Sequence, residues 1–401
     1  MKFSVVIPTR NRLHLLRSAI ETVRRQEGAD WEVIVFDNAS DDPIGAHVRE
    51  LADPRIKYDR SNDFLPVTGS WNRGMSLIEG DYVILLGDDD GLTPDYFRRL
   101  EGVINRFGSP DVVYTDFYQF WHAGVAPWQP APHLLDVKHG FFFAGRTDPF
   151  SLSHADAVRA VTGSLKLRMN FSFNSQAIMY RREFVEQLSQ DGPFFRSPFP
   201  DYHIANKALA KSRHTVVIPQ PLAVAGVSRA SYGYAMYNDQ EAKGDAFLNS
   251  ALESDPVYLS VKSRLLPGRT YNTNYLLSME YVSRETQGEI GVAPDYDRYR
   301  RMQLLTLLQG RSSGPLSRKL WREAKSRLTA AEIAWCYGVL TMIYARNRIP
   351  NLRARIDAIF ADISSVTSVG PSPKHYGPNQ FENVVDLYHA FEAGQFGYSD
   401  S

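Results

Sequence analysis

The fold of this chain is decided by Tyr82-Val83-Ile84-Leu85-Leu86-Gly87-Asp88-Asp89-Asp90, an apolar run that leads through one glycine into three carboxylates. Turn-forming residues precede the run at 79–81 and follow it at Gly91 and Pro94, as is typical of a short strand buried on both faces of a sheet. Residues at the carboxyl end of such a strand reach the crevice where open α/β sheets bind ligands. The sequence therefore predicts three adjacent carboxylates at the rim of a buried sheet.

Three neighbouring carboxylates repel one another at neutral pH. A bound divalent cation is the simplest way to keep them charged, because it takes oxygen ligands. The alternative is a solvated acidic turn that caps the helix beginning near Pro94, since aspartate is common in turns and at helix caps. The remainder of the N-terminal half decides between these interpretations.

Strands and helices alternate through the N-terminal half. Short apolar runs predict further strands at 3–7, 32–36, 56–58 and 112–114, and helices are predicted between them at 13–23, 43–51, 69–79 and 94–107. This alternation favours right-handed βαβ units, and so an α/β fold with a mostly parallel sheet flanked by helices.

Polar clusters follow three of the predicted strands, at Thr9-Arg10-Asn11, Asp37-Asn38 and Asp88-Asp89-Asp90. All three clusters should lie at the same edge of a parallel sheet and converge on one crevice. The turn from Pro8 to Arg12 contains no glycine, and no phosphate loop ending in Lys-Ser/Thr exists. The layout is that of a nucleotide-binding sheet without a glycine cradle, so a carboxylate-held cation is the candidate for neutralising phosphates.

Composition narrows the class of protein. The chain has 401 residues, 43% of them apolar and 22% charged, which predicts a soluble globular protein with one large domain and an appendage, or two domains. Its formal net charge is zero, which argues against nucleic acid or an anionic membrane face as a general electrostatic partner.

The cysteine content and the lengths of the apolar runs indicate in which cellular compartment the protein is expected. Cys336 is the single cysteine, so there is no internal disulfide framework. The apolar segment 3–7 is too short for a signal peptide, and the apolar run 333–345 is shorter than the roughly 20 residues that span a bilayer. We expect no transmembrane segment and a cytoplasmic protein, which could be membrane-adjacent through its substrate.

Five motifs, in this order, resemble those of family 2 glycosyltransferases. They are Val5-Val6-Ile7-Pro8-Thr9-Arg10-Asn11-Arg12, Val35-Phe36-Asp37-Asn38-Ala39-Ser40-Asp41-Asp42, Trp71-Asn72-Arg73-Gly74, Glu79-Gly80-Asp81-Tyr82 and Leu86-Gly87-Asp88-Asp89-Asp90. Members of that family have the GT-A fold and transfer a sugar from a nucleotide diphosphate with inversion. The resemblance covers roughly residues 1–110 and continues more weakly to about 230.

The resemblance implies a donor site. Pro8, Thr9 and Arg10 would line the nucleotide pocket, and either Asp37 or Asn38 would meet a uracil-type base or its ribose. Many members carry two aspartates where this chain has Asp37-Asn38, so the choice between the two stays open.

The same resemblance implies a Mg²⁺ or Mn²⁺ site. Asp89 would be the direct metal ligand, Asp90 would assist, and Asp88 would contact ribose or metal. The chain departs from the common family form Asp-x-Asp-Asp, because Gly87 stands where the first aspartate would be.

A further family pattern, Ala-Arg-Asn-x-Gly, corresponds here to Ser70-Trp71-Asn72-Arg73-Gly74. Asn72 would belong to the donor site. Trp71 cannot replace an arginine beside phosphate, so Arg73 or Arg10 would take that part. The alternative for Arg73 is a solvated arginine on a helix.

An acidic residue at the start of a helix is the general base in the family, and Asp201 occupies the corresponding place. The alternative is a helix cap, and Asp191 and Asp116 are further candidates for the base. His203 is expected to be structural.

The middle of the chain is rich in aromatic residues, at 117–128 and 133–150. These rings would either stack on an acceptor sugar or simply pack onto the sheet. The segment 227–232 stands where many members carry a histidine metal ligand, and it contains none; Arg229 or Tyr232 would contact the diphosphate, or the segment is a mobile loop.

We therefore expect a GT-A-like domain over 1–235, with a nucleotide-sugar half (1–110) and an acceptor half (111–235), and a mainly helical region over 236–401. The helical region would be a cap, an acceptor lid or a dimer surface, so a homo-oligomer stays open.

The predicted function is metal-dependent, inverting transfer from a nucleotide-diphosphate sugar, UDP-sugar by default, to a saccharide or glycoconjugate hydroxyl. One alternative is a nucleotidyltransferase, although such enzymes usually have a glycine-rich basic turn after the first strand. The other is a non-catalytic nucleotide-sugar-binding relative, which the Gly87 and missing-histidine departures suggest.

Overall fold

The buried apolar runs form the strands of one sheet in the computed structural model, which describes residues 1–136, 140–250, 252–309, 316–364, 374–376 and 381–396. Strands β3 (Ile56–Ser61), β2 (Asp30–Asn38), β1 (Lys2–Thr9) and β4 (Tyr82–Leu85) lie side by side in this order and are parallel. The interior residues of β1 and β2 are buried on both faces, as a parallel sheet covered by helices requires.

Helices connect these strands where the apolar spacing predicts them. In α1, Leu16, Ile20 and Val23 face the core, while Arg17 and Arg24 lie on the outer side. The other connecting helices are α2 (Ile44–Glu50), α3 (Val67–Met75) and α4 (Tyr96–Phe107), and α1 itself runs from Leu13 to Arg24.

The second half of the sheet is mixed. Strand β9 (Ile178–Arg181) lies antiparallel between β4 and β6 (Val112–Trp121), and β10 (Thr215–Val227) runs parallel to β6. The sequence pattern predicts a strand that ends at Tyr114. In the structure β6 continues to Trp121, because the aromatic residues that follow are buried in the protein interior. Short strands complete the sheet: β5 (Gly91–Leu92), β7 (His133–Asp136), β8 (Phe150–Ser151) and β11 (Lys374–Tyr376).

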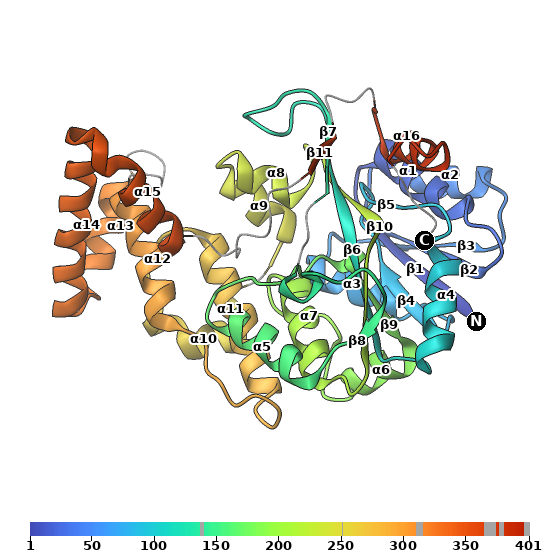
Figure 1. The fold of residues 1–401 in the computed structure, drawn as a ribbon, viewed down its shortest axis with the longest axis horizontal. Coiled ribbons are helices and arrows are strands. Elements are labelled where there is room, and N and C mark those ends of the chain that lie inside the picture. Colours follow the sequence, from blue (N-terminus) through green and yellow to red (C-terminus); the bar gives the residue numbers. More distant parts are fainter. Residues whose placement is uncertain (137–139, 251, 310–315, 365–373, 377–380, 397–401) are drawn as a thin grey trace.

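Helices dominate the remainder of the described chain (Figure 1). The helices that follow β8 and β9 are α5 (His154–Leu165), α6 (Arg182–Leu188) and α7 (Pro200–Lys211). Those beyond β10 are α8 (Tyr232–Tyr237), α9 (Glu241–Leu248), α10 (Pro256–Val261), α11 (Thr270–Glu285), α12 (Tyr296–Leu308), α13 (Leu316–Lys325), α14 (Ala330–Arg348) and α15 (Pro350–Ser364). Single 3-10 turns are η1 (Phe141–Phe143), η2 (Ser175–Ala177), η3 (Leu252–Ser254) and η4 (Lys262–Arg264).

Two elements late in the described chain pack on the N-terminal part and on the sheet. Strand β11 pairs with β7, and α16 (Val384–Glu392) lies beside α1, where the Tyr388 hydroxyl donates to the Arg25 carbonyl. By contrast, α13, α14 and α15 form the end of the molecule farthest from the sheet (Figure 1). Among the described helices, none has both the length and the apolar character to cross a bilayer.

This architecture confirms the predicted class: an α/β fold whose central sheet, parallel through β3-β2-β1-β4, is flanked by helices and followed by a helical extension.

Candidate functional site

The three carboxylates lie at the carboxyl end of β4 and are buried. Asp88, Asp89 and Asp90 expose only 2%, 8% and 6% of their surface. Such low exposures do not fit a solvated acidic turn, and a buried carboxylate must be compensated by hydrogen bonds or positive charge.

Each of the three carboxylates has different partners. Asp88 accepts from the Thr9 hydroxyl at 2.7 Å and from the Arg12 guanidinium at 2.9 Å. Both oxygens of Asp90 accept from backbone amides, those of Gly87 and Gly226, at 2.8 Å. Asp88 and Asp90 are therefore already engaged by the fold.

Asp89 is engaged at one oxygen only. Its Oδ2 accepts from the Ser228 hydroxyl at 2.8 Å, and its Oδ1 has no hydrogen-bond partner among the described residues. Asp89 lines the large cavity together with Asp88 and Asp90, and its Oδ1 is the carboxylate oxygen of the cluster that no described residue engages.

Burial and repulsion between carboxylates disfavour the charged states of Asp88 and Asp90. The pKa of Asp90 is raised well above its usual value by burial and by the charge of Asp89, and the pKa of Asp88 is raised by burial although Arg12 opposes the rise. Burial lowers the pKa of Arg12, but the charges of Asp88 and Asp89 outweigh it and raise that pKa overall. A divalent cation beside the cluster would favour the ionised carboxylates.

The donor set fits a cation that is shared with a ligand. Among the described residues, no group of three His, Cys, Asp or Glu side chains is placed to hold a metal ion. Mg²⁺ is commonly held by one or two carboxylates together with substrate phosphates and water, rather than by a closed protein cage. The open oxygen of Asp89, with Asp88 and Asp90 behind it, matches that mode of binding.

The end of β10 and the turn after it close over the carboxylates. Gly226 and Ser228 bond Asp90 and Asp89, and the Arg12 guanidinium bonds the carbonyl of Ala230 as well as Asp88. A Cβ on Gly226 would lie 1.8 Å from the Asp89 carbonyl oxygen, so only glycine permits this approach.

Removing the positive charge of Arg12, which pairs with Asp88, should destabilise the protein. We expect Arg12→Met to lower the free energy of unfolding by about 3–5 kcal/mol, because Asp88 would stay buried without a partner charge. Urea unfolding at neutral pH measures the change. Arg24→Met, which removes a half-exposed helix arginine from α1, is the matched control and should have a small effect. An unchanged midpoint for Arg12→Met would contradict the pairing.

The second polar cluster, at the end of β2, is held by residues of β3 and of the segment after β3. The fully buried Asp37 accepts from the Tyr58 hydroxyl at 2.8 Å and from Arg60 at 2.9 Å. The Asn38 side chain bonds the amide and the carbonyl of Leu65, at 2.9 and 3.0 Å. Asp37 thus has its charge compensated at the carboxyl end of β2. Asn38 fixes the position of the loop that follows β3.

The remaining candidate donor residues divide into two groups. Pro8 lines the cavity and Thr9 bonds Asp88, whereas the exposed Arg10 lies over the Phe64 ring at 3.9 Å. Asn72 bonds the amide and carbonyl of Phe195, at 3.0 and 2.8 Å. Arg73, whose side chain is 57% exposed, pairs with Asp59 at 2.9 Å. The structure therefore brings Pro8 and Thr9 to the carboxylates but places Asn72 and Arg73 in contacts elsewhere.

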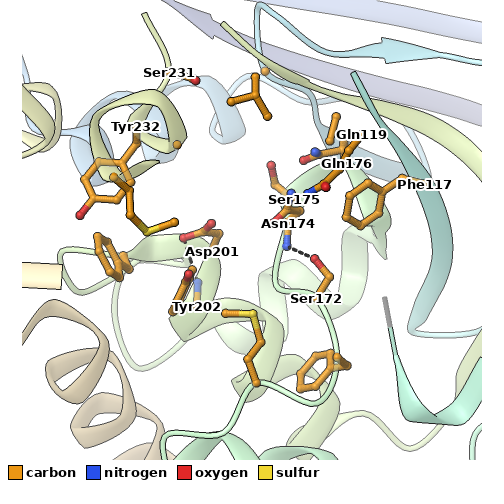
Figure 2. A pocket seen from close by; sticks show the side chains of 18 of the residues that line it. Phe117, Gln119, Ser172, Asn174, Ser175, Gln176, Asp201, Tyr202, Ser231 and Tyr232 are labelled. Atoms are coloured by element: carbon orange, nitrogen blue, oxygen red, sulfur yellow. Dashed lines mark hydrogen bonds between the residues drawn. The ribbon is translucent and has the colours of Figure 1, made fainter. Parts of the chain in front are cut away.

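A cavity of about 1440 Å³ extends from the carboxylates to α7, α8 and α11. Figure 2 shows Asp201 and Tyr202 on one side of it, and Asn174, Ser175 and Gln176 of the η2 region on the other. Polar and aromatic side chains from distant parts of the chain thus share one space with the carboxylate cluster.

Asp201 lies in the first turn of α7 and faces this cavity. Its Oδ1 accepts from the Tyr202 amide at 3.0 Å. Burial raises the pKa of Asp201 to about 7, although the backbone hydrogen bonds oppose the rise. A carboxylate with a pKa near neutrality suits general-base catalysis. Of the two other candidates for the base, Asp191 is exposed on a loop and Asp116 is fully buried in β6.

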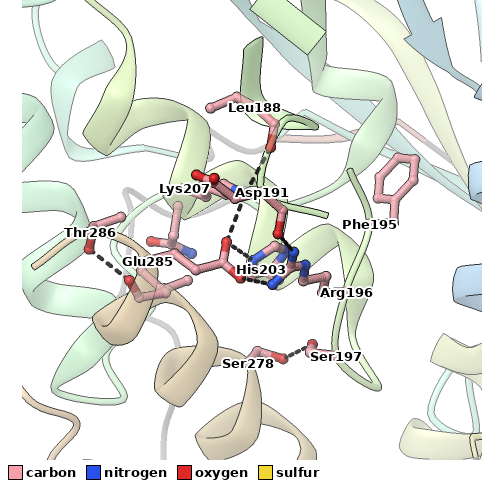
Figure 3. Close-up of polar contacts among 12 residues, drawn as sticks. Leu188, Asp191, Phe195, Arg196, Ser197, His203, Lys207, Ser278, Glu285 and Thr286 are labelled. Carbon is pink, nitrogen blue, oxygen red and sulfur yellow. Dashed lines mark hydrogen bonds and ion pairs between the residues drawn. The ribbon is translucent and has the colours of Figure 1, made fainter. Parts of the chain in front are cut away.

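A buried ion cluster holds the helix that carries Asp201 (Figure 3). Glu285 of α11 accepts from Arg196 at 2.9 Å, from His203 at 3.1 Å and from Lys207 at 2.7 Å. Burial raises the pKa of Glu285, but His203 and Lys207 outweigh this effect and bring the pKa to about 2. The fully buried His203, whose pKa is lowered by burial, therefore belongs to the packing of α7 against α11.

Sequence reasoning did not select Arg12, Gly226 or Ser228 for the site. Arg12 carries a detectable signal, because it lies in the same turn as Thr9. Gly226 and Ser228 carry none, since each is more than a hundred residues from its carboxylate partner. Arg229, which the sequence suggested for the diphosphate, is exposed, and Tyr232 lines the cavity.

Part of the chain is similar to known proteins. Residues 4–160 match the model of glycosyl transferase family 2. A Campylobacter jejuni protein named GalNAc(5)-diNAcBac-PP-undecaprenol beta-1,3-glucosyltransferase is 35% identical over 116 residues, which are 27% of this chain and 38% of that protein. The putative colanic acid biosynthesis glycosyl transferase WcaA of Escherichia coli is 34% identical over 94 residues, 23% of this chain and 34% of its own. Both matches thus leave most of each relative unmatched.

Solved structures also resemble this chain. Residues 1–349 of S. aureus TarS superpose with a TM-score of 0.47 at 14% sequence identity, covering 84% of this chain and 92% of that one.

Proposed function

We propose, from the match of residues 4–160 to the glycosyl transferase family 2 model and from the site described above, that the protein is a metal-dependent, inverting glycosyltransferase. It would take a nucleotide-diphosphate sugar, by default a UDP-sugar, and pass the sugar to a hydroxyl of a saccharide or glycoconjugate. One observation carries the proposal: Asp89, with an open carboxylate oxygen, and Asp201, with a pKa near neutrality, line the same cavity.

At the donor end, Asp89 would hold Mn²⁺ or Mg²⁺ through its open oxygen, with Asp88 and Asp90 adding negative charge behind it. The cation, when bound, would neutralise the diphosphate that leaves. Thr9 and Arg12 keep Asp88 in place, and the Gly226 amide does the same for Asp90. Asp37 or Asn38, at the carboxyl end of β2, would contact the base or ribose.

At the acceptor end, Asp201 would take the proton of the attacking hydroxyl. The new bond forms between the acceptor oxygen and the anomeric carbon, while the bond from that carbon to the diphosphate breaks. The nucleoside diphosphate keeps the electron pair, and the acceptor proton stays on the Asp201 carboxylate. A base and a leaving group on opposite faces of the sugar give inversion.

The acceptor would be a saccharide or glycoconjugate. The cavity offers partly exposed rings for stacking at Tyr202 and Tyr232, and amide groups for hydroxyls at Asn174 and Gln176. The names of the two relatives concern an undecaprenol-linked saccharide and colanic acid, which favours the same class of acceptor.

Donor turnover in the presence of Mn²⁺ tests the proposal. We expect release of UDP from a UDP-sugar, at a rate that depends on Mn²⁺ and rises when an acceptor is added. The panel should also contain GDP- and dTDP-sugars, because the base is an open choice. Release or consumption of pyrophosphate would instead indicate a nucleotidyltransferase. Binding of every donor without any turnover would contradict the proposed activity and favour a non-catalytic relative.

A further inference from the structure

Helix α14 has an unusual composition for a helix at the surface. It contains no charged residue between Glu332 and Arg346. A surface helix normally presents a polar, charged face to water. One side of α14 is accounted for, because Cys336 and Val339 are buried against α12 and its neighbours. The composition of the other side is not explained by burial.

That other side exposes large apolar side chains. Tyr337, Leu340 and Tyr344 recur at intervals that place them on one face of the helix, and they expose 66%, 43% and 63% of their surface. Ile349, 46% exposed, follows as the C-cap of α14. Contiguous exposed apolar surface marks a site of interaction. We call Tyr337, Leu340 and Tyr344 the α14 face.

The surroundings of the α14 face are basic. Four arginines follow within ten residues, and Asp357 is the only acidic residue between positions 333 and 361; the arginines are Arg346, Arg348, Arg353 and Arg355. Asp357 pairs with Arg346 at 2.5 Å and lies 4.0 Å from Arg353. The exposed Arg348 lies 5.4 Å from the Tyr344 ring. The chain as a whole has no net charge, so this positive charge is a local feature.

We propose that the α14 face docks on the surface of an anionic lipid bilayer. Tyrosine rings and aliphatic side chains would enter the interfacial region, and Arg348 and Arg355 would meet lipid phosphates. The uncharged part of α14 is about 13 residues, or roughly 20 Å, long, whereas a bilayer core is about 30 Å thick. The helix would therefore lie along the membrane and not cross it.

Charge favours a lipid surface over a second copy of this chain. A two-fold contact through the α14 face would place the same basic turn of each copy in one interface. The arginines would then repel each other, whereas anionic headgroups neutralise them. In Figure 1 the α13–α15 end lies far from the sheet, so docking there leaves the carboxylate end of the cavity uncovered, although Ser364 of α15 lines the other end.

Flotation of the full chain with vesicles tests the proposal. We expect binding to phosphatidylcholine vesicles that contain phosphatidylglycerol, weak binding to pure phosphatidylcholine, and release by high salt. The double variant Tyr337→Ser/Tyr344→Ser should bind at least about tenfold more weakly, because it removes the two largest exposed rings of the face. Leu259→Ser, at a leucine that is 52% exposed on α10, is the matched control and should bind like the wild type.

A second variant separates charge from apolar contact. Arg348→Glu/Arg355→Glu keeps the α14 face and should abolish the preference for phosphatidylglycerol. The proposal is overturned if the wild type does not bind the anionic vesicles at low salt, or if the tyrosine variant binds as well as the wild type. A wild-type dimer that fails to bind vesicles, and that the tyrosine variant converts to monomer, would assign the face to a second copy and would also overturn it.

Discussion

Replacement of Asp89 by alanine is expected to lower sugar transfer at least about a thousandfold, because it removes the one open carboxylate oxygen of the cluster. The fold should survive, since Asp88 keeps Thr9 and Arg12, and Asp90 keeps its two backbone amides. Chelation of the wild type should cause a loss of similar size, which added Mn²⁺ reverses. Added Mn²⁺ should not restore the Asp89→Ala variant.

Two further variants make this result specific. Asp30→Ala changes an exposed aspartate at the opposite end of the parallel strands and should keep wild-type turnover. Ser228→Ala removes the hydrogen bond to Asp89 but leaves the carboxylate in place, and should cost much less than Asp89→Ala. Near-normal transfer by Asp89→Ala, or full activity after chelation, would refute the assignment of the cation to this residue.

Substitution of Asp201 by asparagine should separate donor binding from transfer. We expect turnover to fall by about a hundred- to ten-thousandfold, which is the range for loss of a general base, while UDP binding stays close to that of the wild type. The asparagine keeps the size of the side chain and the hydrogen bond from the Tyr202 amide, so the local structure should persist. Asp191→Asn, at the exposed alternative, is the matched control and should retain activity. Equal losses in the two variants, or none in Asp201→Asn, would contradict the assignment.

The raised pKa of Asp201 gives this prediction a pH dependence. The base must be ionised to accept a proton, so the transfer rate should rise with pH through about 7 and level off above it. Folding stability should change with pH in the opposite direction to the transfer rate. Because the folded-state pKa lies above that of the unfolded chain, burial penalises the ionised carboxylate, and stability is lost as pH rises from the unfolded value through about 7. Asp201→Asn should therefore unfold at a higher temperature than the wild type at pH 8, although it is inactive.

The N-terminal elements could be predicted from sequence because their physical cause is local. A strand buried on both faces is a short apolar run, as in β1 and β4, and an amphipathic helix shows in the spacing of residues such as Leu16, Ile20 and Val23. The placement of Asp88 to Asp90 at the end of a buried strand follows from the same pattern.

The different hydrogen-bond partners of Asp88, Asp89 and Asp90 could not be predicted, because most of these partners are distant in sequence. Asp89 differs from Asp90 through Ser228 and Gly226 of the β10 end. Arg12 and Arg10 lie in one turn, yet Arg12 points to Asp88 and Arg10 to Phe64. No local pattern distinguishes such neighbours, since the difference is set by tertiary packing.

The packing of β11 and α16 against the N-terminal part of the fold also could not be predicted from the sequence pattern. Strand β11 and α16 follow a long helical region and then pack on β7 and α1. A three-residue edge strand carries no periodic signal, and an amphipathic helix does not specify which partner covers it.

The central claim is that Asp89 binds a divalent cation together with a nucleotide diphosphate, and the anomalous diffraction of manganese tests it most directly. Crystals of the wild type soaked with MnCl₂ and UDP should show a manganese peak within about 2.0–2.3 Å of the Asp89 carboxylate and of the diphosphate oxygens. Bound UDP with no manganese peak beside Asp89 would contradict the account.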